Sequence, residues 1–148
     1  MKLYIELDYL FDSFRFYDED GKLIYKGECD LSLLPVCFIY KNKQKIGMIE
    51  QHSRTVPDFT LYLHDKEIGK MDKDLTLFKP KYNIRFNGYR IEGDFTGFEY
   101  QVYDNQNNKV MSFYKESLFK KNYCLKINDE SNEEICVLIV IATLMGGK

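Results

Sequence analysis

Basic side chains gather beside aromatic residues between positions 79 and 90. Alternation along residues 82–86 places Lys81 and Arg85 on the outer face of a predicted strand. Lys79 lies just before this strand, and Arg90 lies on the segment that follows it. Ammonium and guanidinium groups are the usual protein partners of phosphate. These four residues therefore predict a site for a phosphate headgroup of an anionic lipid or for a phosphorylated ligand.

An ordinary charged surface is the alternative interpretation of these cations. Glu92 and Asp94 also face outward and can pair with the neighbouring cations across strands. A second, weaker basic group consists of Lys115, Lys120 and Lys121.

No other residues form a recognisable catalytic pattern. His52 and His64 are twelve positions apart and have no second ligand at metal-binding spacing. No serine lies in a Gly-x-Ser-x-Gly motif, and no glycine-rich stretch leads into a phosphate-binding helix. We expect no enzyme activity, no metal and no cofactor.

Two acidic stretches are interpreted as turns. Residues 18–21 resemble the start of a calcium loop, but the glutamate required about nine residues after Asp20 is absent. Residues 104–108 form a long polar stretch, where a weakly bound surface ion remains an alternative.

The four cysteines show no Cys-x-x-Cys spacing. Cys29, Cys37, Cys124 and Cys136 are scattered through apolar stretches. We therefore expect buried free thiols rather than a zinc site or a redox pair.

Length and charge restrict the class of protein. The 148 residues suffice for one domain that buries roughly 70% of its unfolded surface. The net charge of −2 gives no overall field that would attract nucleic acid. Glu6 and Asp8 interrupt the apolar start, which argues against a secretory signal, and no apolar run is long enough to span a bilayer. The expected location is cytoplasmic, with no transmembrane segment.

Short alternating segments rich in aromatic residues recur at intervals of roughly 20 residues along the chain. This period predicts strands with one buried face, and polar turns rich in Asp, Asn and Gly separate them. Asn87-Gly88 is the strongest two-residue hairpin signal. With the second limb after each turn and an opening strand near residues 3–7, we predict about twelve strands in an antiparallel meander.

The C-terminus predicts a buried helix over about residues 132–145. Ten of the eleven residues from Ile135 to Met145 are apolar. Ser131 and Glu134 have the spacing of a capping box, and Gly146-Gly147 predicts a left-handed end. About fourteen residues give a rod of about 21 Å, which is too short for a bilayer core. A helix that is apolar on all sides must be buried on all sides.

Closing the predicted sheet around this helix would cover the apolar faces of both the sheet and the helix. Closure removes the exposed edges, and the helix fills the lumen that side chains alone would leave empty. Gly47, Gly69 and Gly93 recur in the second limbs, where they allow a bend or a close approach to the helix. We expect these strand residues to point inward: Phe14, Phe16, Phe38, Tyr40, Phe59, Leu61, Leu63, Tyr82, Ile84, Phe86, Tyr100, Val102, Tyr123, Leu125 and Ile127.

This layout resembles the LURP-one-related family, which belongs to the tubby C-terminal-domain-like superfamily together with phospholipid scramblases. The resemblance rests on Phe16-Tyr-Asp18-x-x-Gly21, on residues 76–84 (TLFKPKYNI), on residues 91–97 (IEGDFTG) and on the terminal helix. It implies a single barrel domain over residues 1–148, with twelve strands enclosing a hydrophobic C-terminal helix. Tubby domains bind phosphoinositides and scramblase relatives act at membranes, but no tubby lipid-binding residue matches a position in this chain.

The functional hypothesis is a non-enzymatic intracellular module that binds anionic phospholipid, as a peripheral membrane protein, or a phosphorylated ligand. The alternative is a structural or protein-interaction role, because residues 36–40 are apolar on both strand faces. An enzyme or small-molecule carrier with a site at the barrel mouth is a further alternative, which the filled lumen disfavours.

Overall fold

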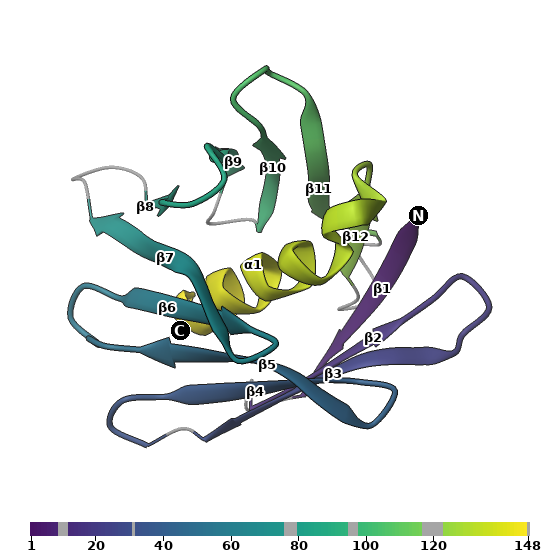
Figure 1. The fold of residues 1–148 in the computed structure, drawn as a ribbon, viewed down its shortest axis with the longest axis horizontal. Coiled ribbons are helices and arrows are strands. Elements are labelled where there is room, and N and C mark those ends of the chain that lie inside the picture. The colour runs from purple at the N-terminus through teal and green to yellow at the C-terminus, as the bar shows by residue number, and fades with distance from the viewer. Residues whose placement is uncertain (9–11, 31, 76–79, 95–97, 117–122, 148) are drawn as a thin grey trace.

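The computed structural model describes residues 1–8, 12–30, 32–75, 80–94, 98–116 and 123–147. Within these residues, twelve strands precede one short 3₁₀ turn and one α-helix (Figure 1). The elements are β1 (Lys2–Leu7), β2 (Ser13–Tyr17), β3 (Leu23–Asp30), β4 (Val36–Lys41), β5 (Gln44–Gln51), β6 (Asp58–Leu63), β7 (Lys66–Leu75), β8 (Pro80–Ile84), β9 (Arg90–Asp94), β10 (Glu99–Tyr103), β11 (Lys109–Lys115), β12 (Tyr123–Ile127), η1 (Glu130–Asn132) and α1 (Glu133–Gly146).

All twelve strands belong to one antiparallel sheet that curves around α1 (Figure 1). The strand order is β8-β7-β6-β5-β4-β3-β2-β1-β12-β11-β10-β9, so β1 pairs with β12 and thereby joins the two ends of the meander. Among the described residues, β8 and β9 form the two edges of the sheet. The predicted fold class is confirmed as a mainly β, nearly closed antiparallel barrel with a C-terminal helix.

The predicted alternation holds in most strands and is wrong in β4. Phe14 and Phe16 of β2 are fully buried, as predicted. In β4, however, Cys37 and Ile39 are buried, whereas Phe38 and Tyr40 lie on the outer face and are only half-buried. Both faces of β4 are apolar, so hydrophobicity does not decide which face points inward. Pairing with β3 and β5 fixes the register instead.

The helix lies inside the barrel with no exposed face. Every residue from Cys136 to Gly146 is buried. Polar groups of the wall bind the helix near its C-terminal end: the Tyr82 hydroxyl donates to the Thr143 carbonyl at 3.1 Å, and the Lys73 ammonium donates to the Gly146 carbonyl at 2.9 Å. The prediction of a helix that is buried on all sides is therefore confirmed.

The predicted helix caps are wrong. The N-cap residue is Asn132, with no side-chain capping bond, because the preceding 3₁₀ turn η1 leads the chain into α1. Ser131 instead donates its hydroxyl to the Asp129 carboxylate at 2.5 Å. At the other end Gly147 has φ −84°, which is not left-handed, and Lys73 satisfies a terminal carbonyl.

The turn at Asn87-Gly88 forms as predicted, but the hairpin ladder does not. Both residues have positive φ, 55° and 65°, and the Tyr89 amide donates to the Phe86 carbonyl at 3.1 Å. The strands on either side diverge, since β8 pairs with β7 and β9 pairs with β10. Phe86 and Tyr89 are both buried, with ring centroids 6.1 Å apart, so side-chain packing joins the sheet edges at this turn.

Candidate functional site

The predicted cations lie near the two sheet edges. Lys81 is exposed on β8, Arg85 is exposed just after β8, and Arg90 is exposed at the start of β9. Lys79 lies outside the described residues, as do Lys120 and Lys121 of the weaker basic group.

Arg85 lies beside acidic residues. Its guanidinium forms an ion pair with Asp72 of β7, and the Asn83 amide donates to the same carboxylate at 2.8 Å. Burial alone would raise the pKa of Asp72, but these hydrogen bonds and the Arg85 charge outweigh it and hold the pKa below its ordinary value. The adjoining depression of about 580 Å³ is also lined by Asp58 and Asp74. Acidic side chains therefore offset the positive charge of Arg85.

Arg90 is engaged along its own strand. Its Nε lies 3.0 Å from the Glu92 carboxylate, and its guanidinium lies 4.8 Å from the centre of the Tyr103 ring. Glu92 thus pairs with a cation as the alternative interpretation expected, although the pairing runs along β9 rather than between paired strands.

A further basic feature, which the sequence did not reveal, lies on the outside of β3 and β4. We call it the lysine groove: a depression of about 570 Å³ lined by Lys22, Leu23, Ile24, Tyr25, Lys26, Glu28, Tyr40, Asn42 and Lys43. The lining contains three lysines and one glutamate. Its volume lies within the range of small-ligand sites.

Of the three lysines in the lysine groove, one has an ion-pair partner among the described residues. Lys26 forms an ion pair with Glu28 at 2.8 Å. Within the described part of the chain, neither Lys22 nor Lys43 forms an ion pair, and both are exposed. Leu23 is 42% exposed beside them and adds an apolar contact surface. The groove therefore combines uncompensated positive charge with exposed hydrocarbon.

Turn geometry positions the two unpaired lysines. The Asp18 carboxylate accepts hydrogen bonds at 2.9 Å from the amides of Asp20 and Lys22, which fixes the turn before β3 as predicted for residues 18–21. Lys43 has φ 70° in the turn between β4 and β5, and the Asn42 amide donates to the Ile24 carbonyl at 3.0 Å. Because Lys22 and Lys43 come from different turns, only the register of β3 with β4 brings them together.

The wall beneath the groove is connected to the start of α1. The Tyr25 hydroxyl donates to the Glu133 carboxylate at 2.7 Å, and the Lys41 ammonium lies 3.5 Å from the same carboxylate. Burial, followed by the hydrogen bond to Glu133, raises the pKa of Tyr25 well above its ordinary value. The floor of the groove is therefore anchored to the buried helix.

The histidines are engaged in single hydrogen bonds to neighbouring side chains. His52 Nε2 lies 2.7 Å from the Thr60 hydroxyl, and His64 Nε2 lies 3.1 Å from the Glu134 carboxylate. Across the described residues, no group of three or more His, Cys, Asp or Glu side chains is placed to hold a metal ion. The Asp104 carboxylate accepts from the amides of Gln106 and Asn108 at 2.9 Å, as expected for a turn.

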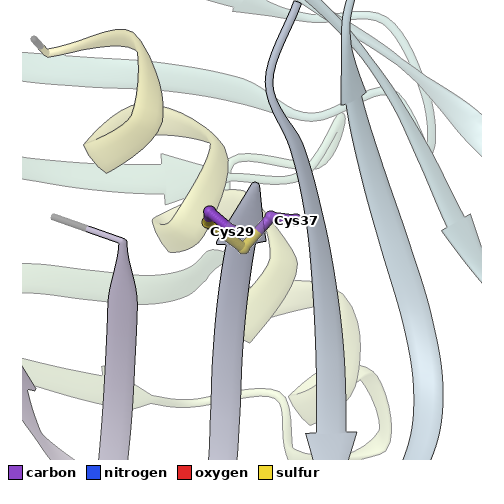
Figure 2. Close-up of a disulfide and its surroundings, with 2 residues drawn as sticks. All are labelled: Cys29 and Cys37. Carbon is purple, nitrogen blue, oxygen red and sulfur yellow. A yellow bond between two sulfur atoms is a disulfide. The ribbon is translucent and has the colours of Figure 1, made fainter. Parts of the chain in front are cut away.

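The prediction of four free thiols is wrong for one pair. Cys29 and Cys37 form a disulfide between β3 and β4 (Figure 2). They lie directly opposite each other in the register, which a spacing of eight residues does not reveal without the turn position. Cys124 and Cys136 are free and buried, as predicted, and burial raises the pKa of Cys136 to about 12.

Comparison with known proteins gives three findings. The model of the LURP-one-related family matches residues 1–143. The chain is 26% identical over 133 residues to the uncharacterized protein YxjI of Bacillus subtilis (strain 168), covering 88% of this chain and 82% of that protein.

The third match is an X-ray structure of a protein from Arabidopsis thaliana, with a TM-score of 0.55 and 12% identity, over 95% of this chain and 89% of that one. It supports the fold alone. In the described part of the chain, no helix has the length and hydrophobicity needed to cross a bilayer. Because the family model spans nearly the whole barrel and helix, this chain belongs to the LURP-one-related family.

Proposed function

We propose that this protein is a non-enzymatic module that binds a phosphate-bearing anionic ligand in the lysine groove, on the outside of the barrel. The ligand is the headgroup of an anionic phospholipid or a free phosphorylated molecule, which share the same phosphate chemistry. The observation that carries the proposal is the groove itself, where exposed Lys22 and Lys43 have no ion-pair partner in the described part of the chain.

The filled lumen supports a site on the outer surface. Barrels that carry small ligands hold them in the interior. Here α1 is buried from Cys136 to Gly146 in that space. A ligand is therefore expected to bind outside the strands, where the groove lies.

The groove lining suits an amphiphile better than a bare ion. Lysine ammonium groups bind phosphate oxygens as point charges. Leu23 and Tyr40 add apolar contacts next to them. An anionic lipid uses both features, because its headgroup meets the lysines while its glycerol and upper acyl chain meet the apolar side chains.

The cations near the sheet edges remain a second candidate surface. Lys81 lies opposite Asp74 in the β7–β8 register, and the ion pairs of Arg85 and Arg90 reduce the charge available to a ligand. Charge reversal at Lys81 is therefore expected to weaken binding less than charge reversal in the lysine groove.

Exposed aliphatic residues favour the alternative of a protein-interaction role. Leu33 is 80% exposed, and Leu34 and Val56 are each 48% exposed, on two loops that are joined by a 2.7 Å hydrogen bond from Arg54 to the Ser32 carbonyl. Solution mass measured over a range of concentrations tests self-assembly, and a monomer throughout would contradict it.

Vesicle flotation tests the main proposal. We expect the protein to float at low salt with phosphatidylcholine vesicles that contain phosphatidylserine, and not with phosphatidylcholine alone. The double variant Lys22→Glu/Lys43→Glu is expected to bind at least roughly 30-fold more weakly, since each cation near a membrane contributes about 1 kcal/mol and the two new carboxylates add repulsion.

The matched control is Lys70→Glu/Lys126→Glu, which changes the net charge equally at exposed lysines outside the groove. An equal loss in both variants would contradict a local site. Titration with inorganic phosphate, followed by NMR shifts of groove amides, separates a free phosphate ligand from a lipid. If neither vesicles nor phosphate bind at low salt, the proposal is wrong.

A further inference from the structure

The two cysteines of the disulfide differ in exposure, because Cys29 is half-buried and Cys37 is fully buried. We propose that Cys29 is a thiol-modification site: the Cys29–Cys37 disulfide exchanges with a low-molecular-weight thiol, which forms a mixed disulfide on Cys29, and Cys37 is the resolving thiol. This inference is independent of the lysine groove and of its ligand.

The register places the two cysteines so that the bond can form and break without a change of fold. They are direct partners on β3 and β4, with Cα atoms 3.9 Å apart. The Cys29 amide donates to Asp12 and not to β4, so the two cysteines occupy a narrow, non-hydrogen-bonded position of the β3–β4 pair, where opposing side chains lie closest. When the bond opens, the ladder on either side keeps the two sulfurs opposite each other.

The two sulfurs differ in access. Cys37 is fully buried: its Sγ and the Cδ1 of Ile141 both line the space where a Cβ on Gly27 would lie, at 3.6 and 3.2 Å. Cys29, near the end of β3, is only half-buried, and exposed Leu33 and Leu34 follow it in the loop to β4. Figure 2 shows the bond bridging the two strands in front of α1. An attacking thiol therefore meets Cys29 first.

The surrounding structure holds these strands together without the bond. The β3–β4 ladder pairs six residues on each strand, from Tyr25↔Lys41 to Asp30↔Val36. The Cys29 amide also donates to the Asp12 carbonyl at 2.8 Å, which attaches the end of β3 to the residue before β2. A domain of this length buries enough surface to fold without a crosslink. We therefore expect both the oxidised and the reduced chain to be folded.

The exchange balances as two thiol–disulfide steps. A thiolate attacks Cys29 Sγ, a new sulfur–sulfur bond forms there, the Cys29–Cys37 bond breaks, and Cys37 leaves as a thiolate that takes up a proton. A second thiol then attacks the mixed disulfide, releasing the small-molecule disulfide and Cys29 as a thiol. Two electrons pass from the small thiols to the protein. In the reverse direction Cys37 attacks the mixed disulfide and expels the thiol.

The test equilibrates the full chain with glutathione buffers that range from fully reduced to fully oxidised. After acid quenching and alkylation, peptide mass spectrometry measures the disulfide, the two free thiols and any glutathione adduct. We expect the disulfide fraction to follow the buffer ratio, the adduct to map to Cys29, and circular dichroism to stay native throughout.

Single variants separate the two roles. With Cys37→Ser the adduct is expected to accumulate on Cys29, because no resolving thiol remains. With Cys29→Ser, buried Cys37 is expected to react at least about tenfold more slowly than Cys29 does in the Cys37→Ser variant, and buried Cys124 is expected to react as slowly as Cys37. If a variant fails to fold, the position of the adduct in the wild type still shows which cysteine is attacked. An adduct on Cys37, a disulfide that is present or absent in every buffer, or exchange only upon unfolding would overturn the proposal.

Discussion

The hydroxyl of Tyr100 lies 2.7 Å from Oγ1 of Thr143, and both residues are buried. Oγ1 of Thr143 also donates to the Val140 carbonyl at 2.9 Å, so its single proton is used and it accepts from Tyr100. This contact joins β10 to the one polar residue between Ile135 and Gly146 of α1. The barrel wall thus satisfies the polar groups of α1 as well as covering its hydrocarbon.

We expect a double-mutant cycle to detect this bond. Thr143→Val and Tyr100→Phe should each lower the free energy of unfolding by about 1 kcal/mol, the usual net value of one hydrogen bond. The double variant should lose less than the sum, because neither polar group then remains. Urea unfolding measures all four proteins, and strict additivity would mean that the two hydroxyls do not interact.

Gly93 is expected to tolerate no side chain. It has φ +147°, and a Cβ there would lie 2.3 Å from the Glu99 carbonyl oxygen and 2.5 Å from the Tyr100 Cα. Gly93→Ala should lower the free energy of unfolding by more than about 2 kcal/mol.

Gly21→Ala is the matched control, since Gly21 also has positive φ, +80°, but nothing lies within 4 Å of the added Cβ. Gly21→Ala should lower the free energy of unfolding by about 1 kcal/mol, because of backbone conformation alone. Equal costs at the two positions, measured by urea unfolding, would show that contact with β10 is not the cause at Gly93.

Reduction of the disulfide should lower the melting temperature without unfolding the protein. A crosslink between residues eight positions apart is expected to stabilise the fold by about 2–3 kcal/mol through loss of chain entropy in the unfolded state. For a domain of this size, that corresponds to roughly 5–10 °C. Calorimetry with and without dithiothreitol measures the shift. The variant Cys29→Ala/Cys37→Ala should show none, and a similar shift in that variant would assign the effect to another cause.

Asp72 should contribute to acid stability. Its pKa in the folded state lies below the ordinary value of 3.8, so its contribution is present above that pH and is lost as the pH falls through the folded value. Arg85 is 62% exposed, so the contribution should stay below about 1 kcal/mol.

Asp72→Asn should therefore be less stable than the wild type near neutral pH, and the difference should shrink below pH 4. Urea unfolding across this pH range measures it. Asp20→Asn serves as the control, because Asp20 is exposed, lies far from Arg85 in the sequence and forms no ion pair within the described part of the chain. A difference that persists unchanged at low pH would contradict the pairing of Asp72 with Arg85.

The architecture was predictable because the strand pattern and the helix pattern each indicate a surface that the other element can cover. Alternating strands such as β2 and β10 need one covered face, and the apolar segment of α1 needs cover on every side. The wrong predictions concern single elements. Because β4 is apolar on both faces, the face that points inward depends on its pairing with neighbouring strands, which cannot be read from the sequence. The capping box failed because a 3₁₀ turn occupies the residues that it would use.

The candidate site was harder to predict than the fold. The cations from Lys79 to Arg90 stand close together in sequence, whereas Lys22 and Lys43 lie in separate turns and meet only through the β3–β4 register. The same register brings Cys29 opposite Cys37. Features that depend on which residues face each other across strands leave no local signal, and both the lysine groove and the disulfide are of this kind.

Hydrogen exchange of backbone amides, with and without vesicles that contain phosphatidylserine, tests the central claim most directly. That claim is that α1 stays inside the barrel while ligand binds to the outside. Amides of residues 137–144 should exchange among the slowest in the protein and be unaffected by vesicles, whereas peptides covering residues 22–28 and 40–43 should be protected when vesicles are present. Fast exchange in the helix, or a change there upon vesicle binding, would contradict the account.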